Sequence, residues 1–540
     1  MIVTLDGKKA EVTPGTNVLS IVKEGTLACK VDNYLESLSY EINSEVDIKS
    51  VDLSSVLGQR IFERSLVFVL IKAVRELYPT ARVIVQHSIS NGIFVEIKNV
   101  GKAISPAMAK AISYRMNQII DSKEPFKKEI LRKYEAEKMF LEDNQLDKVE
   151  LLKQRPEDYI PIFSLGWYKD FSHLPIVPHA GLLKPFELKF YLPGFILQIP
   201  TYKNPDMIAP YVEQPKLAQV FSEEEKQAEI LEVSNVTSLN RKIFANAKRL
   251  ILISEAIHAR KLTLLAEQII SNPEKRLILI AGPSSSGKTT FAQRLSIQLE
   301  SLGYKPISIS LDDYFVDREK TPLDEDGQPD YENINAIELE LFNDQLARLM
   351  QGEKVEAPVF NFKLGKRDDK KRELSVGYNQ PIIIEGIHGL NEELTHAIPK
   401  NRKFKVYVSA LTQLNIDDHN RVPTTDARLI RRIVRDFRFR NHDALKTLRM
   451  WPKVRRGEEK YIFPYQEEAE FMFNSALPYE LAVLKPYVEP LLVKVEQTED
   501  EFSEAQRLLQ FLQFFSGLNS ESIPADSILR EFIGGSVFYS

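Results

Sequence analysis

The sequence predicts a multidomain α/β protein that ends in a parallel sheet flanked by helices, and three observations support this class. The chain has 540 residues, whereas a single hydrophobic core rarely extends beyond about 250–300 residues. Apolar runs such as "RLILIAG", "PIIIEGI" and "FKVYVSA" recur after residue 275 with helical patterns between them, as in strands covered on both faces. Gly282–Thr289 reads G-x-x-x-x-G-K-T directly after such a run, which is typical of a strand, a phosphate-binding loop and a helix.

The composition is that of an ordinary globular protein, with 43% hydrophobic and 27% charged residues. No apolar run approaches the roughly 18 residues of a membrane span, and the N-terminus has no signal-peptide core. The single cysteine, Cys29, excludes an internal disulfide and a thiolate metal cluster within one chain. We therefore expect a cytoplasmic protein with no membrane partner.

The charge balance bears on nucleic-acid partners. The formal net charge is −5, and residues 1–60 carry six Lys and Arg against nine Asp and Glu. A global attraction to RNA is therefore not expected. An RNA role of the N-terminal segments would need a local basic patch.

Residues 1–59 alternate short β-rich runs with turns, as in "MIVTL", "DGK" and "KAEV". The segment "CKVDNYLESLSYEI" resembles part of a TGS domain, the ubiquitin-like β-grasp module. The resemblance implies a β-grasp unit over residues 1–59.

Residues 60–210 predict a mixed α+β unit. Leu66–Tyr78 has apolar residues at helical spacing, two strands flank the turn at Ser90-Asn91-Gly92, and residues 105–140 look helical. The order resembles the second, editing-associated domain of threonyl-tRNA synthetase. Four positions where that family places metal-ligating or catalytic His and Cys residues differ, so we expect no editing chemistry here; they are Arg64, Phe68, Ser172 and Ile176.

The remaining chain divides into three segments. Residues 211–272 read as a charged helical connector that lacks Gly and Pro from 222 until Pro273. Residues 273–496 predict the βαβ domain, with a late strand at "PLLVKV" (490–495). Residues 497–540 predict a helical tail.

The G-x-x-x-x-G-K-T stretch predicts a nucleotide site, since glycines let backbone N–H groups surround phosphates and the helix N-terminus adds positive charge. Lys288 would neutralise the outer phosphates, and the Thr289 hydroxyl would ligate Mg²⁺. The predicted ATP-binding residues are Gly282, Pro283, Ser284, Ser285, Ser286, Gly287, Lys288, Thr289 and Thr290.

Acidic residues follow two other predicted strands. Asp312 and Asp313 follow "PISISL", and Glu385 ends "PIIIE", at the edge where α/β sheets bind ligands. Adjacent acids point to different sides, so Asp312 is the predicted base that deprotonates an acceptor hydroxyl. Glu385 is predicted in the Mg²⁺ shell, whereas His388 reads as structural.

An arginine-rich helix, "DARLIRRIVRDFRFRNHD", follows. Arginines that converge on a transferring phosphate stabilise its charge and can close a lid over it. Six candidates occur in this stretch, and not all of them can face ATP; they are Arg428, Arg431, Arg432, Arg435, Arg438 and Arg440.

These motifs together resemble the uridine kinase and phosphoribulokinase family of P-loop kinases. The order "GPSSSGKTT", "SLDDYF", "APVFNF", "IIIEGI" and "DARLIRRIVRD" carries the resemblance. It implies ATP and Mg²⁺ as cofactors, with Asp312 as base, Glu385 near the metal, and Arg435 and Arg440 as catalytic arginines of the lid. The residues implied to bind the acceptor are Asp312, Tyr314, Glu332, Phe360 and Phe362.

The departures from the family fall on the acceptor side. Phe360 replaces the tyrosine of the family's base pocket, Gly365 replaces a base-reading histidine, and Glu332 replaces a ribose-binding Asp. We therefore expect phosphoryl transfer to the 5′-hydroxyl of a nucleoside, with loose base selection, by an enzyme that forms homo-oligomers.

Two alternatives remain open at this point. A phosphoribulokinase-like or pantothenate kinase-like enzyme would need a cationic pocket, which Lys363, Lys366 and Arg367 could form. A nucleotide-regulated RNA- or ribosome-binding protein would use the same P-loop as a switch.

Overall fold

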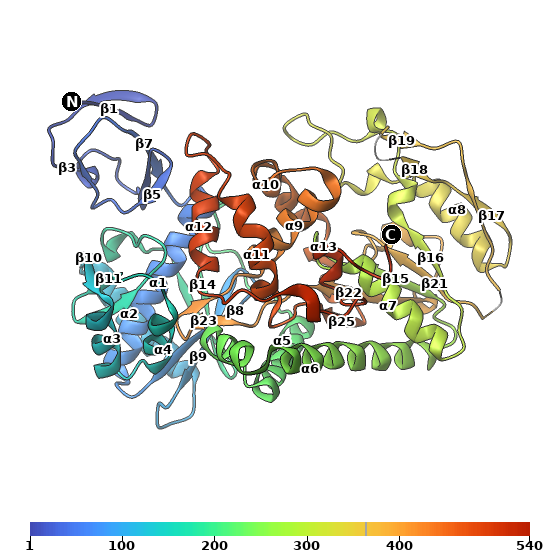
Figure 1. Cartoon of the computed structure of the whole chain (residues 1–540), viewed down its shortest axis with the longest axis horizontal. Coiled ribbons are helices and arrows are strands. Elements are labelled where there is room, and N and C mark those ends of the chain that lie inside the picture. Colours follow the sequence, from blue (N-terminus) through green and yellow to red (C-terminus); the bar gives the residue numbers. More distant parts are fainter. Residues whose placement is uncertain (362–363, 378, 540) are drawn as a thin grey trace.

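The computed structural model describes residues 1–361, 364–377 and 379–539. Figure 1 shows the N-terminal segments on one side of the molecule and the sheet that carries the phosphate loop on the other. Within the described ranges, no helix is both long and apolar enough to cross a bilayer.

The first segment is a mixed sheet with strand order β2-β1-β7-β4-β5. Its strands are β1 (Ile2–Leu5), β2 (Lys8–Glu11), β4 (Ala28–Val31), β5 (Tyr34–Glu36) and β7 (Asp47–Val51), beside a ribbon of β3 (Thr16–Asn17) and β6 (Glu41–Ile42). β1 pairs in parallel with β7 and antiparallel with β2. Val3, Cys29 and Ile48 are buried in its core, and the β-rich runs predicted within residues 1–59 are strands of this sheet.

The second segment combines helices with antiparallel sheets. One sheet has the order β13-β14-β9-β8 and the other β10-β11-β12. The strands are β8 (Arg82–Ile89), β9 (Gly92–Lys98), β10 (Lys127–Arg132), β11 (Tyr159–Leu165), β12 (Tyr168–Phe171), β13 (Glu187–Tyr191) and β14 (Gly194–Gln198). The helices are α1 (Val56–Leu77), α2 (Pro106–Asp121), α3 (Lys133–Glu142) and α4 (Leu146–Gln154). The helical prediction for 105–140 is wrong over β10, whose mixed charged and apolar residues pair with β11.

The connector is helical, as predicted. It contains α5 (Pro215–Leu231) and α6 (Val236–Ile270), with non-helical backbone at Asn246 inside α6. α6 runs along the lower side of the molecule in Figure 1, and its buried residues Leu262, Leu265 and Ile269 share a core with the phosphate-loop domain.

The C-terminal sheet is parallel throughout, with strand order β16-β21-β15-β22-β25. Its strands are β15 (Leu277–Ala281), β16 (Ile307–Ser310), β21 (Ile382–Glu385), β22 (Lys403–Ser409) and β25 (Phe471–Asn474). Helices α7 (Lys288–Ser301), α8 (Leu339–Met350), α9 (Thr424–Arg440), α10 (Ala444–Tyr461) and α11 (Glu480–Leu492) belong to the same segment. Short ribbons are formed by β17 (Val355–Ala357) with β20 (Arg372–Leu374), and by β18 (Phe360–Asn361) with β19 (Lys366–Arg367). Because the strands are parallel, their carboxyl ends meet at one edge, where the phosphate loop, Asp312 and Glu385 follow.

The predicted strand at residues 490–495 is wrong. Residues 490–492 belong to the end of α11, which tolerates Pro486 and Pro490 inside the helix, and residues 493–495 form a turn. The fifth strand is instead β25, which pairs in parallel with β22. Apolar periodicity does not separate a short buried strand from a buried helical turn.

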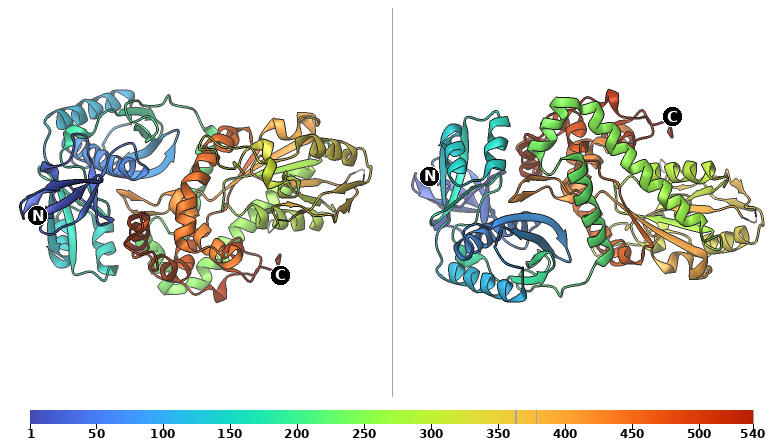
Figure 2. Two further views of the ribbon diagram at one scale, coloured as in Figure 1. Left: turned by 90° about the horizontal axis from the view of Figure 1, so that it is seen from above. Right: turned by 90° about the horizontal axis from the view of Figure 1, so that it is seen from below.

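A hairpin joins the C-terminal and second segments. It is formed by β23 (Asn415–Asp417) and β24 (Asn420–Arg421) and reaches from the C-terminal part toward the blue strands in both views of Figure 2. At its tip, His419 Nδ1 lies 2.6 Å from Lys148 Nζ and 2.9 Å from an oxygen of Asp170. All three side chains are buried, so the hairpin fixes the two segments together.

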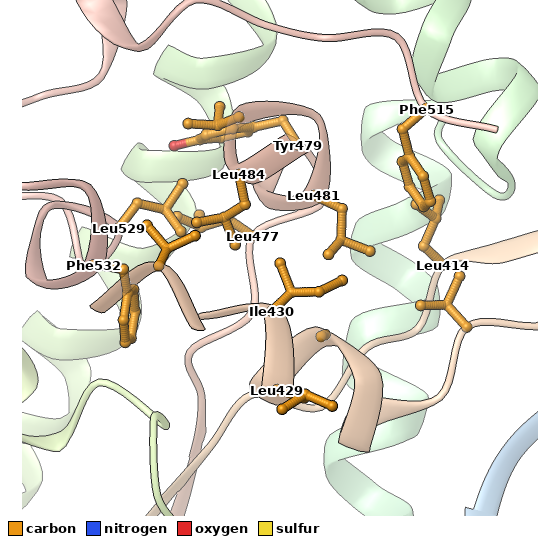
Figure 3. Close-up of a cluster of buried hydrophobic side chains, with 14 of the residues drawn as sticks. Leu414, Leu429, Ile430, Leu477, Tyr479, Leu481, Leu484, Phe515, Leu529 and Phe532 are labelled. Carbon is orange, nitrogen blue, oxygen red and sulfur yellow. The ribbon is translucent and has the colours of Figure 1, made fainter. Parts of the chain in front are cut away.

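The tail folds back onto the C-terminal segment. It contains α12 (Phe502–Leu512) and the short α13 (Arg530–Ile533). Leu529 and Phe532 lie in one buried cluster with Ile430 of α9 and Leu484 of α11 (Figure 3). Their burial anchors the end of the chain beside the phosphate loop.

Candidate active site

The phosphate loop depends on glycines at two positions. A Cβ at Gly282 would lie 1.9 Å from the carbonyl oxygen of Val408, so only glycine lets the loop pass the neighbouring strand. Gly287 has a φ of +83°, which favours glycine. The loop thus passes from β15 into α7 as the sequence predicts.

The predicted magnesium ligands lie together. The Thr289 hydroxyl donates to Glu385 Oε1 at 3.4 Å, although these residues are 96 positions apart in sequence. Burial raises the pKa of Glu385 to about 7, and Lys288 opposes that shift. A hydroxyl and a carboxylate are hard oxygen donors, which fit Mg²⁺.

Lys288 occupies the centre of the charged groups. Its ammonium group donates to the carbonyl oxygen of Pro283 at 3.2 Å. Burial lowers the pKa of Lys288, while Glu385, Glu531 and Asp312 raise it. The lysine therefore sits within reach of both the phosphate loop and the acidic residues.

Asp312 and Asp313 point to different partners, as expected for adjacent residues. Although solvent reaches Asp312, desolvation by the surrounding protein raises its pKa, and Lys288 and Arg440 lower it in part. Asp313 instead accepts from the backbone N–H of Phe360 at 3.5 Å and lies 3.8 Å from Arg372. Of the two, Asp312 is the carboxylate that interacts electrostatically with Lys288, Arg435 and Arg440.

Three arginines of α9 brace the phosphate loop. Arg428 donates to the carbonyl oxygen of Ser284 at 3.0 Å, and Arg431 donates to that of Ser285 at 3.3 Å. Arg432 donates to the Ser284 hydroxyl at 2.7 Å. Helical spacing alone could not separate these bracing residues from the lid.

Arg435 and Arg440 remain on the reactive side. The positive charges of both arginines lower the pKa of Asp312. Arg435 Nε lies 3.8 Å and Arg440 Nη1 3.2 Å from Oδ1 of the buried Asp436. Burial and Arg440 lower the pKa of Arg435 to about 10. The two predicted lid arginines are thus near Asp312, and Asp436 positions both.

The predicted acceptor residues do not all share one place. Glu332 is half-buried, and burial together with Glu458 raises its pKa to about 7, against Arg432 and Lys288. Tyr314 is buried and donates its hydroxyl hydrogen to Gln345 at 2.8 Å, so its ring belongs to the core. Phe360 is half-buried with its ring 5.8 Å from that of Phe315. Phe362 lies outside the described residues.

Three glutamates that the sequence did not mark contact the phosphate loop or the arginines that brace it. Glu458 accepts from the backbone N–H of Ser284 at 2.9 Å and pairs with Arg428. Glu480 pairs with Arg431 at 2.5 Å, and Glu531 contacts Thr290. No motif marks these glutamates. Glu458 is 30 residues from Arg428, Glu480 is 49 residues from Arg431, and Glu531 is 241 residues from Thr290.

The four substituted positions of the synthetase-like segment are all buried; they are Arg64, Phe68, Ser172 and Ile176. Arg64 donates to the carbonyl oxygen of Phe171 at 2.7 Å. Phe68 packs against Tyr168 with ring centroids 4.6 Å apart. The residues at these positions therefore serve packing and hydrogen bonding within the core.

Comparison with known proteins yields two regional similarities. Residues 277–480 match the profile of the "Phosphoribulokinase / Uridine kinase family". The N-terminal part is similar to threonine–tRNA ligases, with 29% identity over 191 residues in Desulforamulus reducens and 27% over 197 residues in Nitratidesulfovibrio vulgaris. These matches cover 34% and 35% of this chain, and the chain spans only 30% of the length of either relative.

Solved structures with similarity to this chain include a "possible uridine kinase" from Bacillus stearothermophilus. It is 20% identical with a TM-score of 0.28, covering 40% of this chain and 98% of that one. A D-glycerate 3-kinase from Cryptococcus neoformans is 13% identical with a TM-score of 0.21, covering 50% and 88%. The family match, the parallel sheet and the phosphate loop show that residues 277–480 are similar to the P-loop kinases of the phosphoribulokinase/uridine kinase family, and the N-terminal part is similar to threonine–tRNA ligases.

Proposed function

We propose that the C-terminal domain transfers the terminal phosphoryl group of ATP to the 5′-hydroxyl of a nucleoside. The observation that carries this proposal is that Asp312, two residues after the end of β16, interacts electrostatically with Lys288, Arg435 and Arg440. A switch that only binds nucleotide has no need for a carboxylate among the phosphate-binding groups. A carboxylate there can take the proton of an attacking hydroxyl.

Each residue of the site then has a role. Lys288 and the N–H groups of the loop bind the phosphates, and Thr289 and Glu385 would hold Mg²⁺, which neutralises charge on the transferring group. Asp312 orients the acceptor hydroxyl and accepts its proton. Arg435 and Arg440 stabilise the negative charge that spreads over the phosphoryl oxygens.

Two observations favour a nucleoside over an anionic acceptor. Glu332 interacts electrostatically with Lys288 and with Asp312, and a carboxylate suits ribose hydroxyls but repels a phosphate or carboxylate group. Arg367, a candidate for an anion pocket, pairs with Glu338 and donates to the carbonyl oxygen of Tyr314. Lys366 is exposed, and Lys363 lies outside the described residues.

Steady-state rates of ADP formation test the acceptor class. We expect activity with uridine, cytidine, adenosine and inosine within about 10- to 200-fold of one another, because an apolar pocket discriminates only weakly. Ribulose 5-phosphate and pantothenate should be poor acceptors. Activity confined to either anionic compound would reject the nucleoside, and a uridine preference above about a thousandfold would reject the loose pocket.

The acceptor reaction should depend on the ionisation of Glu332. A carboxyl group with a pKa of about 7 is neutral below that pH, so its ability to accept hydrogen bonds from ribose falls as the pH falls. At saturating Mg²⁺, which lowers the pKa of Glu385, we expect kcat/KM for the nucleoside to decline below about pH 7. Glu332→Gln should flatten that decline; an unchanged pH profile in the variant would contradict the role of Glu332.

We also propose that residues 60–210 form a unit between a TGS-like segment (1–59) and the helical connector (211–272). This unit has a binding or structural role and no editing chemistry. None of Arg64, Phe68, Ser172 and Ile176 can replace imidazole or thiolate. We expect the full chain to contain no stoichiometric zinc at this segment and not to hydrolyse seryl-tRNA. Metal analysis that finds one zinc per chain, or measurable deacylation, would contradict this.

A further inference from the structure

The C-terminal tail places an acidic side chain on the phosphate loop. Glu531, in α13, accepts hydrogen bonds through Oε2 from both the hydroxyl group (2.9 Å) and the backbone N–H (3.2 Å) of Thr290. Its other oxygen lies 3.7 Å from Nη1 of Arg435. One carboxylate thus engages a loop residue and a lid arginine together.

Both partners of Glu531 are groups that a nucleotide would use. Thr290 stands in the first turn of α7, where backbone N–H groups have no carbonyl partner within the helix and bind anions. Arg435 is a cation of the proposed lid. A carboxylate and a phosphate cannot accept from the same N–H group at once, and two anions at that spacing repel each other.

Packing of the neighbouring residues places Glu531 against the phosphate loop. Leu529 and Phe532 are buried in the cluster of Figure 3, and the Phe532 ring lies 5.0 Å from the guanidinium carbon of Arg431. Ile528 packs so closely on the loop that a Cβ at Gly287 would lie 2.5 Å from it. The hydroxyl of Tyr539 lies 3.4 Å from that of Thr290.

We infer that the tail is an autoinhibitory segment in which Glu531 occupies a phosphate position of the nucleotide site and must leave when nucleotide binds. The inference rests on the proposed function, because it assigns Thr290 and Arg435 to the nucleotide. Displacement frees Arg435 for the transferring phosphoryl group, so nucleotide binding and lid formation become one step. The tail therefore lowers the affinity of the resting enzyme for nucleotide.

Nucleotide binding, measured by calorimetry on the full chain with ADP and Mg²⁺, tests this without depending on catalysis. Glu531→Gln keeps the size and removes the charge, and we expect it to bind ADP about tenfold more tightly or better, the order of one charge-assisted hydrogen bond. The matched control is Glu521→Gln, an exposed glutamate of the same tail, which should bind as the wild type does. Equal or weaker binding by Glu531→Gln overturns the inference and leaves the kinase proposal standing, whereas no binding by any of the proteins overturns both.

Hydrogen exchange on the wild-type chain gives a second test that needs no variant. Saturating ADP should increase amide exchange over residues 528–539 while it protects residues 282–290. Unchanged or slower exchange in the tail would overturn the inference even if Glu531→Gln failed to fold.

Discussion

Replacing Asp312 by Asn is expected to lower the turnover number by about 10²- to 10⁴-fold, the usual contribution of a general base. The amide keeps the shape of the side chain but cannot take the proton of the acceptor hydroxyl. Affinity for ATP should be largely kept. Single-turnover rates and ADP affinity, measured on the same protein, separate the two effects.

Two further variants test whether the loss of turnover is specific to Asp312. Asp313→Asn should have a small effect, because Asp313 interacts with the backbone of Phe360 and with Arg372. Lys288→Ala should weaken both ATP binding and rate, since the proposed role of the lysine is to bind the phosphates. Near-normal turnover in Asp312→Asn, with loss in Asp313→Asn, would move the base to Asp313.

The largest loss of stability is expected at Arg431. This side chain is fully buried, pairs with Glu480 at 2.5 Å and donates to the carbonyl oxygen of Ser475 at 2.9 Å. Arg431→Met leaves the Glu480 charge buried without its partner, which should lower the free energy of unfolding by about 3–5 kcal/mol. Denaturant unfolding in a Trp167→Phe background measures this, since Trp451 is then the one tryptophan of the chain and reports on the C-terminal domain.

The controls for Arg431 use the same substitution elsewhere. Arg456 pairs with Asp326 at the exposed surface, so Arg456→Met should cost less than about 1 kcal/mol. The double variant Arg431→Met with Glu480→Leu should recover much of the lost stability, because removing both charges avoids the unpaired one. A similar small loss in all three proteins would show that the pair does not hold the loop.

The sequence could predict the reactive edge of the sheet because that information is local. Gly282 and Asp312 stand within two residues after the ends of β15 and β16, and Glu385 is the last residue of β21. Parallel strands bring such residues to one edge. The Thr289 to Glu385 contact follows from that rule alone.

What the sequence could not predict depends on contacts between distant segments. Arg431 and Arg435 are both arginines of the same helix, so the sequence does not distinguish their roles. The packing of α9 against α11 and α13 places Arg431 on the phosphate loop and Arg435 beside Glu531. Glu531 lies 241 residues from Thr290, in a tail with no motif. The strand β25 is four residues long, too short for its period to distinguish it from the apolar end of α11.

Identification of the product tests the central claim most directly. The full chain is incubated with ATP, Mg²⁺ and uridine, and the products are followed by phosphorus NMR with proton coupling. If the domain phosphorylates the 5′-hydroxyl of the nucleoside, we expect a phosphomonoester signal that is coupled to the two 5′-protons and forms in step with ADP. Release of inorganic phosphate and ADP with the nucleoside unchanged, across the nucleoside panel, would contradict it and favour a nucleotide-hydrolysing switch.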